Sequence, residues 1–302
     1  MTADRRTVLR TAARLAALTA TGGLLTACGT GAPRRADPGA LAAHPGTVDP
    51  QHVTDPAWNG GEGPASPAPT TPAEAQPTPE ATAAAAQTSA PPTPPALPPL
   101  APGTPVEVVY GARTGKNVAL TFHGSGDPKL ATALLETAEQ RGAKLTVMVV
   151  GSWLDQQPQM ARRILDGGHE LGNHTQNHLN ISAMTPDQAR AEIAQCAERL
   201  QRLTGSIGRW FRPSAAQYAT PMVREQARAV GYEHVLSFDV DPRDYSDPPA
   251  AELQRRVLNS VRGGSVVALH MGHQCTVDAL PAILDGLAKA GLKPVTASQL
   301  CA

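Results

Sequence analysis

From residue 105 onward this chain alternates short apolar runs with amphipathic stretches of helical length, and this alternation limits the fold more than any other feature. The apolar runs predict strands at residues 118–122, 145–150, 170–172, 210–211, 234–240, 265–269 and 293–296. The amphipathic stretches predict helices at 128–141, 155–167, 186–203, 221–230, 249–262 and 277–290. Repeated strand-then-helix units predict an α/β fold with a mostly parallel sheet. This many units favour closure into a (β/α) barrel, whose site lies at the carboxyl ends of the strands.

Residues 1–28 have the features of an export signal. Arg5 and Arg6 resemble a twin-arginine motif, and the apolar run that follows them is short for a membrane span. The run ends in Leu25-Thr26-Ala27-Cys28, which resembles a bacterial lipobox. We expect a lipid on Cys28 to anchor the exported chain to the outer face of the cytoplasmic membrane. The alternative is an amphipathic N-terminal helix that happens to contain a cysteine.

Residues 29–104 predict a disordered linker. Pro, Ala, Thr, Gly and Gln dominate this segment, and Trp58 is its only aromatic residue. Such a composition buries too little apolar surface to offset the conformational entropy lost on folding. Its proline runs favour extended geometry, so we expect a partly stiff spacer. The folded domain is therefore expected at 105–302, which is long enough for one sizeable core.

The balance of charges argues against one class of partner. The chain has 26 basic and 26 acidic residues, and this balance argues against a nucleic-acid partner.

Beyond Cys28 the chain has three more cysteines, Cys196, Cys275 and Cys301, whose spacing matches no metal motif. An odd number in an exported protein permits one disulfide and one free thiol, and Cys275 with Cys301 is the candidate pair.

Two histidines four residues apart, His174 and His178, suggest a metal site. At this spacing they lie on one side of a helical turn or tight loop and can share one ion. Chance also produces such pairs. Here, however, Gly172 and several polar neighbours predict a loop at a strand end, which is where sites form in α/β folds.

Other strands also end beside residues that can bind metal or carry protons. His123 and Asp127 follow the strand at 118–122, and Arg212 follows the strand at 210–211. Asp244 and His270 follow the strands at 234–240 and 265–269. If the barrel closes, these side chains converge on one cleft.

Four of these segments together resemble the polysaccharide deacetylase family, also called the NodB homology domain or carbohydrate esterase family four. The matching motifs are His174-Thr175-Gln176-Asn177-His178, Arg212-Pro213, Asp241-Pro242-Arg243-Asp244-Tyr245 and Ala268-Leu269-His270. The resemblance covers nearly all of 105–302 and implies a distorted (β/α) barrel. It also implies metal-dependent removal of acetyl groups from N-acetylated glycans such as peptidoglycan.

The first motif of the family is altered. Members usually carry Thr-Phe-Asp-Asp-Gly-Pro, in which one Asp is the catalytic base and the next is the third metal ligand. Here the segment 121–128 reads Thr-Phe-His-Gly-Ser-Gly-Asp-Pro, which is two residues longer. His123 takes the position of the base, and the longer loop offers Asp127 as metal ligand or base. A neutral imidazole suits either role, so the sequence leaves both assignments open.

The resemblance implies a role for each site residue. His174, His178 and Asp127 would hold a divalent metal, for which zinc is the expected ion, and His123 or Asp127 would act as base. His270 would protonate the leaving amine, with Arg212 and Asp244 tuning base and acid. The N–H of Ala215 would bind the oxyanion, and Tyr245 would contact substrate.

Each of these roles has a structural alternative. Arg212 and Asp244 would form an ion pair, and His270 would be a core histidine. For the whole protein, the alternative to a deacetylase is a catalytically inactive, glycan-binding envelope lipoprotein on the same fold.

Overall fold

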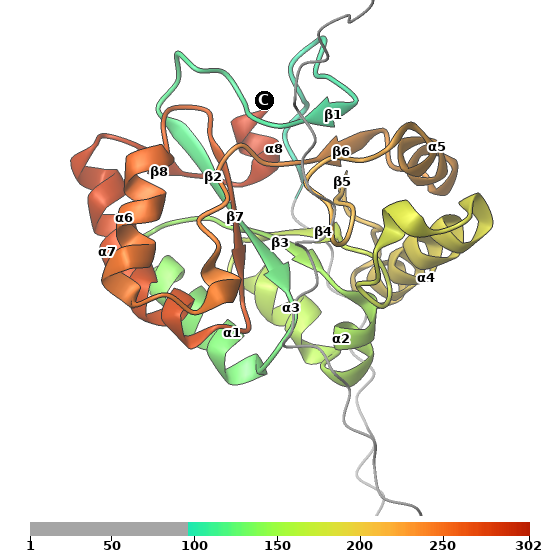
Figure 1. The fold of residues 1–302 in the computed structure, drawn as a ribbon, viewed down its shortest axis with the longest axis horizontal. Helices are drawn as coiled ribbons and strands as arrows, with labels where there is room; N and C mark the ends of the chain where they lie inside the picture. Colours follow the sequence, from blue (N-terminus) through green and yellow to red (C-terminus); the bar gives the residue numbers. More distant parts are fainter. Residues whose placement is uncertain (1–95) are drawn as a thin grey trace, which may run out of the picture. The chain divides into compact units, whose positions relative to one another are not determined.

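A curved parallel sheet runs through residues 96–302, the part of the chain that the computed structural model describes (Figure 1). The predicted signal peptide, Cys28 and most of the predicted linker lie outside these residues. The strands are β1 (Glu107–Val108), β2 (Asn117–Gly124), β3 (Thr146–Val149), β4 (Glu170–Asn173), β5 (Trp210–Phe211), β6 (His234–Leu236), β7 (Val266–His270) and β8 (Lys293–Pro294). Every pair of these strands that is hydrogen-bonded is parallel.

The sheet curls until its two sides meet. Its strand order is β1-β6-β5-β4-β3-β2-β7, and β8 pairs with the start of β2. Val240, which follows β6, forms a parallel bridge with Val267 of β7, and Tyr110 forms an antiparallel bridge with Ser265. These bridges join the β6 side of the sheet to β7 and so confirm the predicted distorted barrel.

Eight helices and two 3-10 turns occur within the described residues. They are α1 (Pro128–Gln140), α2 (Gly151–Gln156), α3 (Gln159–Asp166), α4 (Pro186–Thr204), α5 (Pro221–Val230), α6 (Ala250–Ser260), α7 (Gln274–Lys289), α8 (Ala297–Leu300), η1 (Ile181–Ala183) and η2 (Asp244–Ser246). Thr185 begins α4 in a capping box with Gln188, and Gly205 ends it at φ 77°. In Figure 1, α1, α6 and α7 lie beside β2 and β7, whereas α4 and α5 lie beside β5 and β6.

Two predicted elements differ most from the structure, and the others differ at most in their bounds. The helix predicted at 155–167 is two helices, α2 and α3, because Pro158 has no N–H to continue the first and instead precedes the second. The strand predicted at 234–240 ends at Leu236. Beyond it the Asp239 carboxylate accepts a hydrogen bond from the backbone N–H of Val266 at 2.7 Å, and the N–H groups of Asp239 and Val240 donate to the Val266 carbonyl.

Alternation along β2 decides which side chains enter the barrel. Leu120 and Phe122 pack in the outer core beneath the helices, whereas Ala119 packs in the inner core with Met148. His123 lies inside the strand rather than after it, paired in register with His270 of β7. Because it shares the face of Ala119, its side chain points into the barrel.

Packing of the chain begins before residue 105. Leu100 packs against the inner core, and the Pro98 carbonyl accepts a hydrogen bond from Arg209 Nη1 at 2.7 Å. The N–H of Ala101 donates to the Cys301 carbonyl at 2.8 Å. This segment therefore closes the amino end of the barrel. Among residues 96–302, no helix has the length and apolar character needed to cross a membrane.

The cysteines of the described region are unpaired. Cys196, Cys275 and Cys301 are all free thiols, so the suggested Cys275–Cys301 disulfide is wrong. The physical reason is their placement. Cys275 donates to the Asp244 carbonyl beyond the carboxyl ends of the strands, whereas Cys301 lies at the amino end beside Ala101.

Candidate active site

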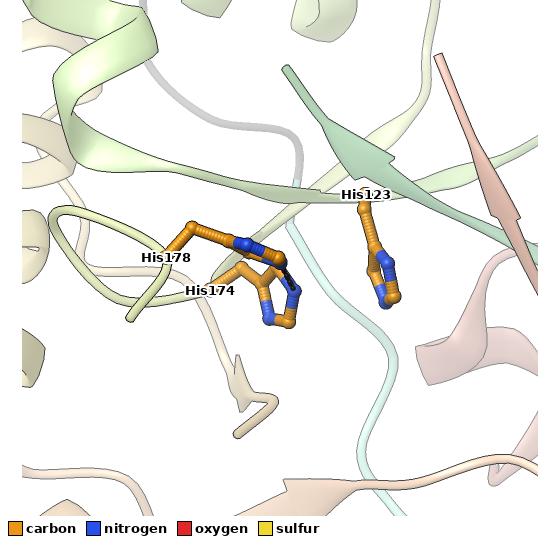
Figure 2. Close-up of side chains that lie close together, drawn as sticks. All are labelled: His123, His174 and His178. Carbon is orange, nitrogen blue, oxygen red and sulfur yellow. Dashed lines mark hydrogen bonds between the residues drawn. The ribbon is translucent and has the colours of Figure 1, made fainter. Parts of the chain in front are cut away.

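Three histidines meet at the carboxyl end of the barrel strands. His123 extends from β2, and His174 and His178 come from the loop after β4 (Figure 2). One potential ligand atom from each histidine lies within 4.8 Å of the others. His123 is 9% exposed and His174 is 1% exposed, so the group is largely shielded from water.

His174 and His178 are placed as a pair of metal ligands. Their Nε2 atoms lie 3.1 Å apart, and His174 Nδ1 lies 3.0 Å from the Arg212 carbonyl oxygen. A carbonyl only accepts, so Nδ1 carries the proton and Nε2 keeps its lone pair. Tetrahedral zinc with bonds of about 2.0–2.1 Å holds its ligand nitrogens roughly 3.3 Å apart, close to the separation seen here. The pair therefore fits a divalent metal.

The loop that carries these histidines is held by α4. Glu192 accepts hydrogen bonds from Asn177, at 2.8 Å from its N–H and at 2.6 Å from Nδ2. Thr175 and His178 adopt positive φ angles of 68° and 57°, which non-glycine residues rarely adopt outside functional sites. Glu192 was missed in the sequence analysis, although an acidic residue among the apolar positions of α4 is a usable signal.

His123 lies against this pair in a different orientation. Its ring stacks on the His174 ring with centroids 4.2 Å apart and planes only 19° apart. Imidazole lone pairs lie in the ring plane, so one ion cannot bond in-plane to both of these rings as they stand. His123 Nδ1 instead lies 2.8 Å from His270 Nε2, and its Nε2 lies 3.3 Å from Arg212 Nη1.

His270 is oriented by a buried carboxylate. Asp244 Oδ1 lies 2.7 Å from His270 Nδ1, and Oδ2 accepts from the backbone N–H of His270 and from Thr276 Oγ1, each at 2.7 Å. Burial alone would raise the pKa of Asp244, but the charge of His270 and the hydrogen bonds from His270 and Thr276 bring that pKa below its ordinary value. Asp244 is therefore a carboxylate that fixes the His270 tautomer. Thr276 was missed in the sequence analysis.

Arg212 is wholly buried, and among residues 96–302 no carboxylate pairs with it. Its Nε donates to the Leu236 carbonyl at 2.8 Å and its Nη2 to the Ser237 carbonyl at 3.3 Å. The possible Arg212–Asp244 ion pair is therefore absent, because Asp244 faces His270 instead. Burial lowers the pKa of Arg212 to about 9.

Burial also keeps two of the histidines neutral. It lowers the pKa of His123 well below 6.5, and the nearby His174, His270 and Arg212 lower it further. Burial and then His178 lower the pKa of His174 in the same direction. Neutral rings are the form that binds metal or accepts a proton at pH 7.

Asp127 is not brought to the histidines. Its side chain accepts from the N–H of Lys129 at 2.8 Å and so caps α1. The extra loop residues turn through Gly126, whose φ is +91° and whose carbonyl accepts from Trp153 Nε1 at 2.9 Å. This turn directs Asp127 toward the helix, and the arrangement does not support the expectation that Asp127 is the third ligand or the base.

The two residues expected to contact substrate lie near this group. The Tyr245 ring stands perpendicular to the His270 ring, at 85° and 5.5 Å between centroids. Ala215 is half-buried with φ 53°, and the neighbouring Ser214 hydroxyl donates to the Leu179 carbonyl just after His178. Tyr245 therefore borders His270, and Ala215 adjoins a residue that contacts the loop carrying His178.

Comparison with known proteins finds one family. The polysaccharide deacetylase profile matches residues 110–235. A peptidoglycan-N-acetylglucosamine deacetylase of Bacillus cereus is 32% identical over 189 residues, which span 61% of this chain and 88% of that protein.

Solved structures agree with the barrel. A crystal structure of a peptidoglycan N-acetylglucosamine deacetylase matches with a TM-score of 0.61 and 27% identity, over 65% of this chain and 92% of that one. A pseudoenzyme of carbohydrate esterase family four from Bacillus anthracis matches with a TM-score of 0.62 over 66% of this chain and 70% of that one. At 24% identity the second match shows only a shared fold.

Proposed function

This chain belongs to the polysaccharide deacetylase family, and on that premise we propose that it is a metal-dependent hydrolase that removes acetyl groups from an N-acetylated cell-wall glycan such as peptidoglycan. The relatives named as peptidoglycan-N-acetylglucosamine deacetylases support this substrate class. The observation that carries the proposal is a metal-binding pair, His174 and His178, set against a hydrogen-bonded chain of His123, His270 and Asp244.

His174 and His178 would hold the cation, and we propose zinc because neutral imidazole is among its preferred ligands. When bound, the ion supplies a Lewis acid that polarises the acetamide carbonyl and acidifies the attacking water. The Arg212 carbonyl fixes the His174 tautomer, and Glu192 holds the loop that carries His178. Because His123 stacks on His174, we assign His123 to proton transfer rather than to the metal.

The hydrogen-bonded histidines provide a path for that proton. Asp244 binds His270 Nδ1–H, so neutral His270 accepts the Nδ1 proton of His123 at its Nε2. His123 therefore has its lone pair on Nε2. To take the proton of the attacking water there, Nε2 exchanges its 3.3 Å contact with Arg212 Nη1 for a contact with that water. The Nδ1 proton of His123 then passes to His270.

His270, now an imidazolium stabilised by Asp244, donates its Nε2 proton to the departing sugar amine. The proton removed from water is thus replaced by one delivered to the amine, and His270 returns to its starting tautomer. His123 is left with its proton on Nε2 and regains the starting form after product release, when it loses that proton to solvent water and takes one from water at Nδ1. The N–H of Ala215 is proposed as a donor to the oxyanion, and Tyr245 as one wall for the sugar.

We also propose that the chain is exported and held at the outer face of the cytoplasmic membrane by a lipid on Cys28. This part rests only on the order of the Arg5-Arg6 pair, the apolar run and the lipobox-like segment in the sequence. Labelling with a radioactive fatty acid tests it, because label should enter the wild-type chain and not the Cys28→Ala variant.

A second candidate is a catalytically inactive, glycan-binding envelope protein. The observation that favours it is the loss of both Asp residues from the first motif, with Asp127 capping α1 instead of replacing them. Acetate release separates the two functions. The full-length chain should release acetate from N-acetylated peptidoglycan fragments. This release should stop when the metal is chelated and should return when zinc is restored. Glycan binding without acetate release under any of these conditions would favour the inactive protein.

A further inference from the structure

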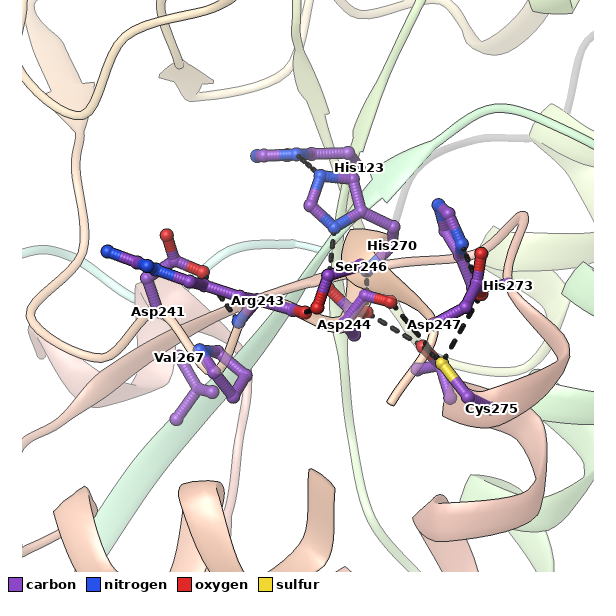
Figure 3. A network of polar contacts seen from close by, with 12 residues as sticks. His123, Asp241, Arg243, Asp244, Ser246, Asp247, Val267, His270, His273 and Cys275 are labelled. Atoms are coloured by element: carbon purple, nitrogen blue, oxygen red, sulfur yellow. Dashed lines mark hydrogen bonds and ion pairs between the residues drawn. The ribbon is translucent and has the colours of Figure 1, made fainter. Parts of the chain in front are cut away.

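A second aspartate–histidine pair stands beside the first, outside the chemistry assigned above. His273 Nδ1 lies 2.8 Å from Asp247 Oδ1, and the spacing repeats that of Asp244 and His270 three residues earlier on each side (Figure 3). The His273 ring stands 5.8 Å from the His270 ring at 79°. The two pairs are therefore neighbours around the residue that delivers the proton.

Within residues 96–302 the His273 side chain makes one hydrogen bond, to Asp247. It stands at the N-cap of α7, yet it makes no side-chain capping bond there. Its ring is nonetheless only 10% exposed, whereas the carboxylate that orients it is 66% exposed. The Nε2 atom of this shielded ring takes part in no hydrogen bond with the described residues.

The backbone around this pair is also unusual. Asp247 has φ 47° and Arg243 has φ 55°, so both ends of the η2 turn adopt left-handed conformations without glycine. Left-handed backbone at non-glycine residues is uncommon and tends to cluster at functional sites. The Cys275 thiol donates to the Asp244 carbonyl at 3.3 Å and lies 3.6 Å from Asp247 Oδ1, which ties the two aspartates together.

The tautomer of His273 determines what it can bind. A carboxylate accepts, so Nδ1 donates to Asp247 and Nε2 of the neutral ring is an acceptor. The Tyr245 ring at 5.5 Å and the His273 ring at 5.8 Å both stand nearly perpendicular to the His270 ring. Both rings therefore border the residue that protonates the leaving amine.

We propose that His273, positioned by Asp247, accepts a hydrogen bond from a hydroxyl of the sugar whose amine is released at His270. This inference rests on the proposed deacetylase function and adds a residue that binds the amine-bearing sugar. A hydroxyl is the expected group because the chain has only 3% aromatic residues, so polar contacts must supply much of the glycan binding.

The test compares His273→Ala, His273→Gln and Asp247→Ala in the full-length chain, with His234→Ala as control. His234 is a suitable match because its Nδ1 bonds the Pro105 carbonyl on the β6 side of the barrel, away from η2. Two quantities are measured: kcat and KM for acetate release from N-acetylglucosamine oligosaccharides, and calorimetric affinity of the metal-free chain for the same oligosaccharides.

His273→Ala should raise KM about five- to tenfold and weaken oligosaccharide binding by a similar factor, with kcat changed less than about threefold. Glutamine places an acceptor near the position of Nε2 and should recover most of the loss. Asp247→Ala should raise KM about two- to fivefold, because the ring then loses its orientation. His234→Ala should match wild type.

The inference is overturned if His273→Ala leaves KM and affinity unchanged, or if it lowers kcat at constant KM. With either result for His273→Ala, the deacetylase function is retained as long as the wild-type chain releases acetate. A wild-type chain that neither binds the oligosaccharides nor releases acetate overturns both proposals together.

Discussion

The two ends of the barrel each bury an ionisable side chain, and the two side chains differ in their polar partners. At the amino end, Glu170 accepts from Trp210 Nε1 at 3.0 Å, from the Ser298 N–H at 3.0 Å, from the Ser298 hydroxyl and from Thr146 Oγ1. At the carboxyl end, Arg212 meets two carbonyls and a histidine but no carboxylate of the described residues. A buried carboxylate whose hydrogen bonds are all made, such as Glu170, stabilises one structure. A buried cation without a carboxylate partner, such as Arg212, is destabilising and is typical of a functional site.

The largest effect is expected at the metal pair. His174→Ala removes one of the two fixed ligands and should abolish stoichiometric zinc binding, with acetate release falling by roughly a thousandfold or more because the Lewis acid is lost. Elemental analysis after dialysis measures the bound metal. A His174→Ala chain that still holds zinc tightly would remove His174 from the site.

Removing the proton donor should cost somewhat less. His270→Ala should lower kcat by about a hundredfold to ten-thousandfold while bound metal stays unchanged, because general acid catalysis contributes a factor of that size. Asp244→Asn is the matched variant, since it keeps the shape of the side chain but not its charge. If His270→Ala keeps more than about a tenth of the wild-type kcat, another group protonates the amine.

At the opposite end the expected effect is on stability alone. Glu170→Ala leaves the buried Ser298 N–H without its acceptor and leaves Trp210 Nε1 with the Ser298 hydroxyl alone, and it should lower the free energy of unfolding by about 2–4 kcal/mol. Denaturant unfolding of the metal-free chain measures this loss. Bound metal and kcat of the folded variant should stay at the wild-type values, and a large fall in kcat would contradict a purely structural role.

A smaller change, of opposite sign, is expected from His123→Asp. This variant places a carboxylate near the unpaired Arg212 and should raise the free energy of unfolding of the metal-free chain by about 1–2 kcal/mol at pH 7. Lower stability in the variant would mean that Arg212 does not need a counter-charge.

The pH dependence should sharpen this comparison. Wild-type stability should fall as pH drops below about 6.5, because the unfolded chain protonates histidines whose folded pKa values burial has lowered. The new Asp would have its pKa lowered by Arg212, so its contribution is present above about pH 4 and lost below it. The gap between variant and wild type should therefore widen between pH 6.5 and about 4 in parallel unfolding titrations.

Local signals allowed most of the fold to be predicted from sequence. The helix Pro221–Val230 was predicted to the residue, because Thr220 caps it and Gly231 ends it at φ 117°. Barrel closure followed from the number of strand-then-helix units. The sequence also placed His174, His178 and His270 at strand ends, where the structure has them.

The altered first motif was not predictable in the same way. Whether His123 belongs to β2 depends on pairing with His270, which is 147 residues away in sequence. The direction of Asp127 depends on the φ angle of Gly126 and on its contact with Trp153. Long-range register and loop direction arise from tertiary packing, which spacing along the chain does not encode.

The most direct test of the account is bound zinc and acetate release, measured side by side for the full-length wild type and His123→Ala. We expect close to one zinc per chain in both proteins and acetate release from wild type alone, because His123 carries protons while His174 and His178 hold the metal. Loss of zinc from His123→Ala would make His123 a ligand. A zinc-loaded wild type that releases no acetate would contradict the deacetylase itself.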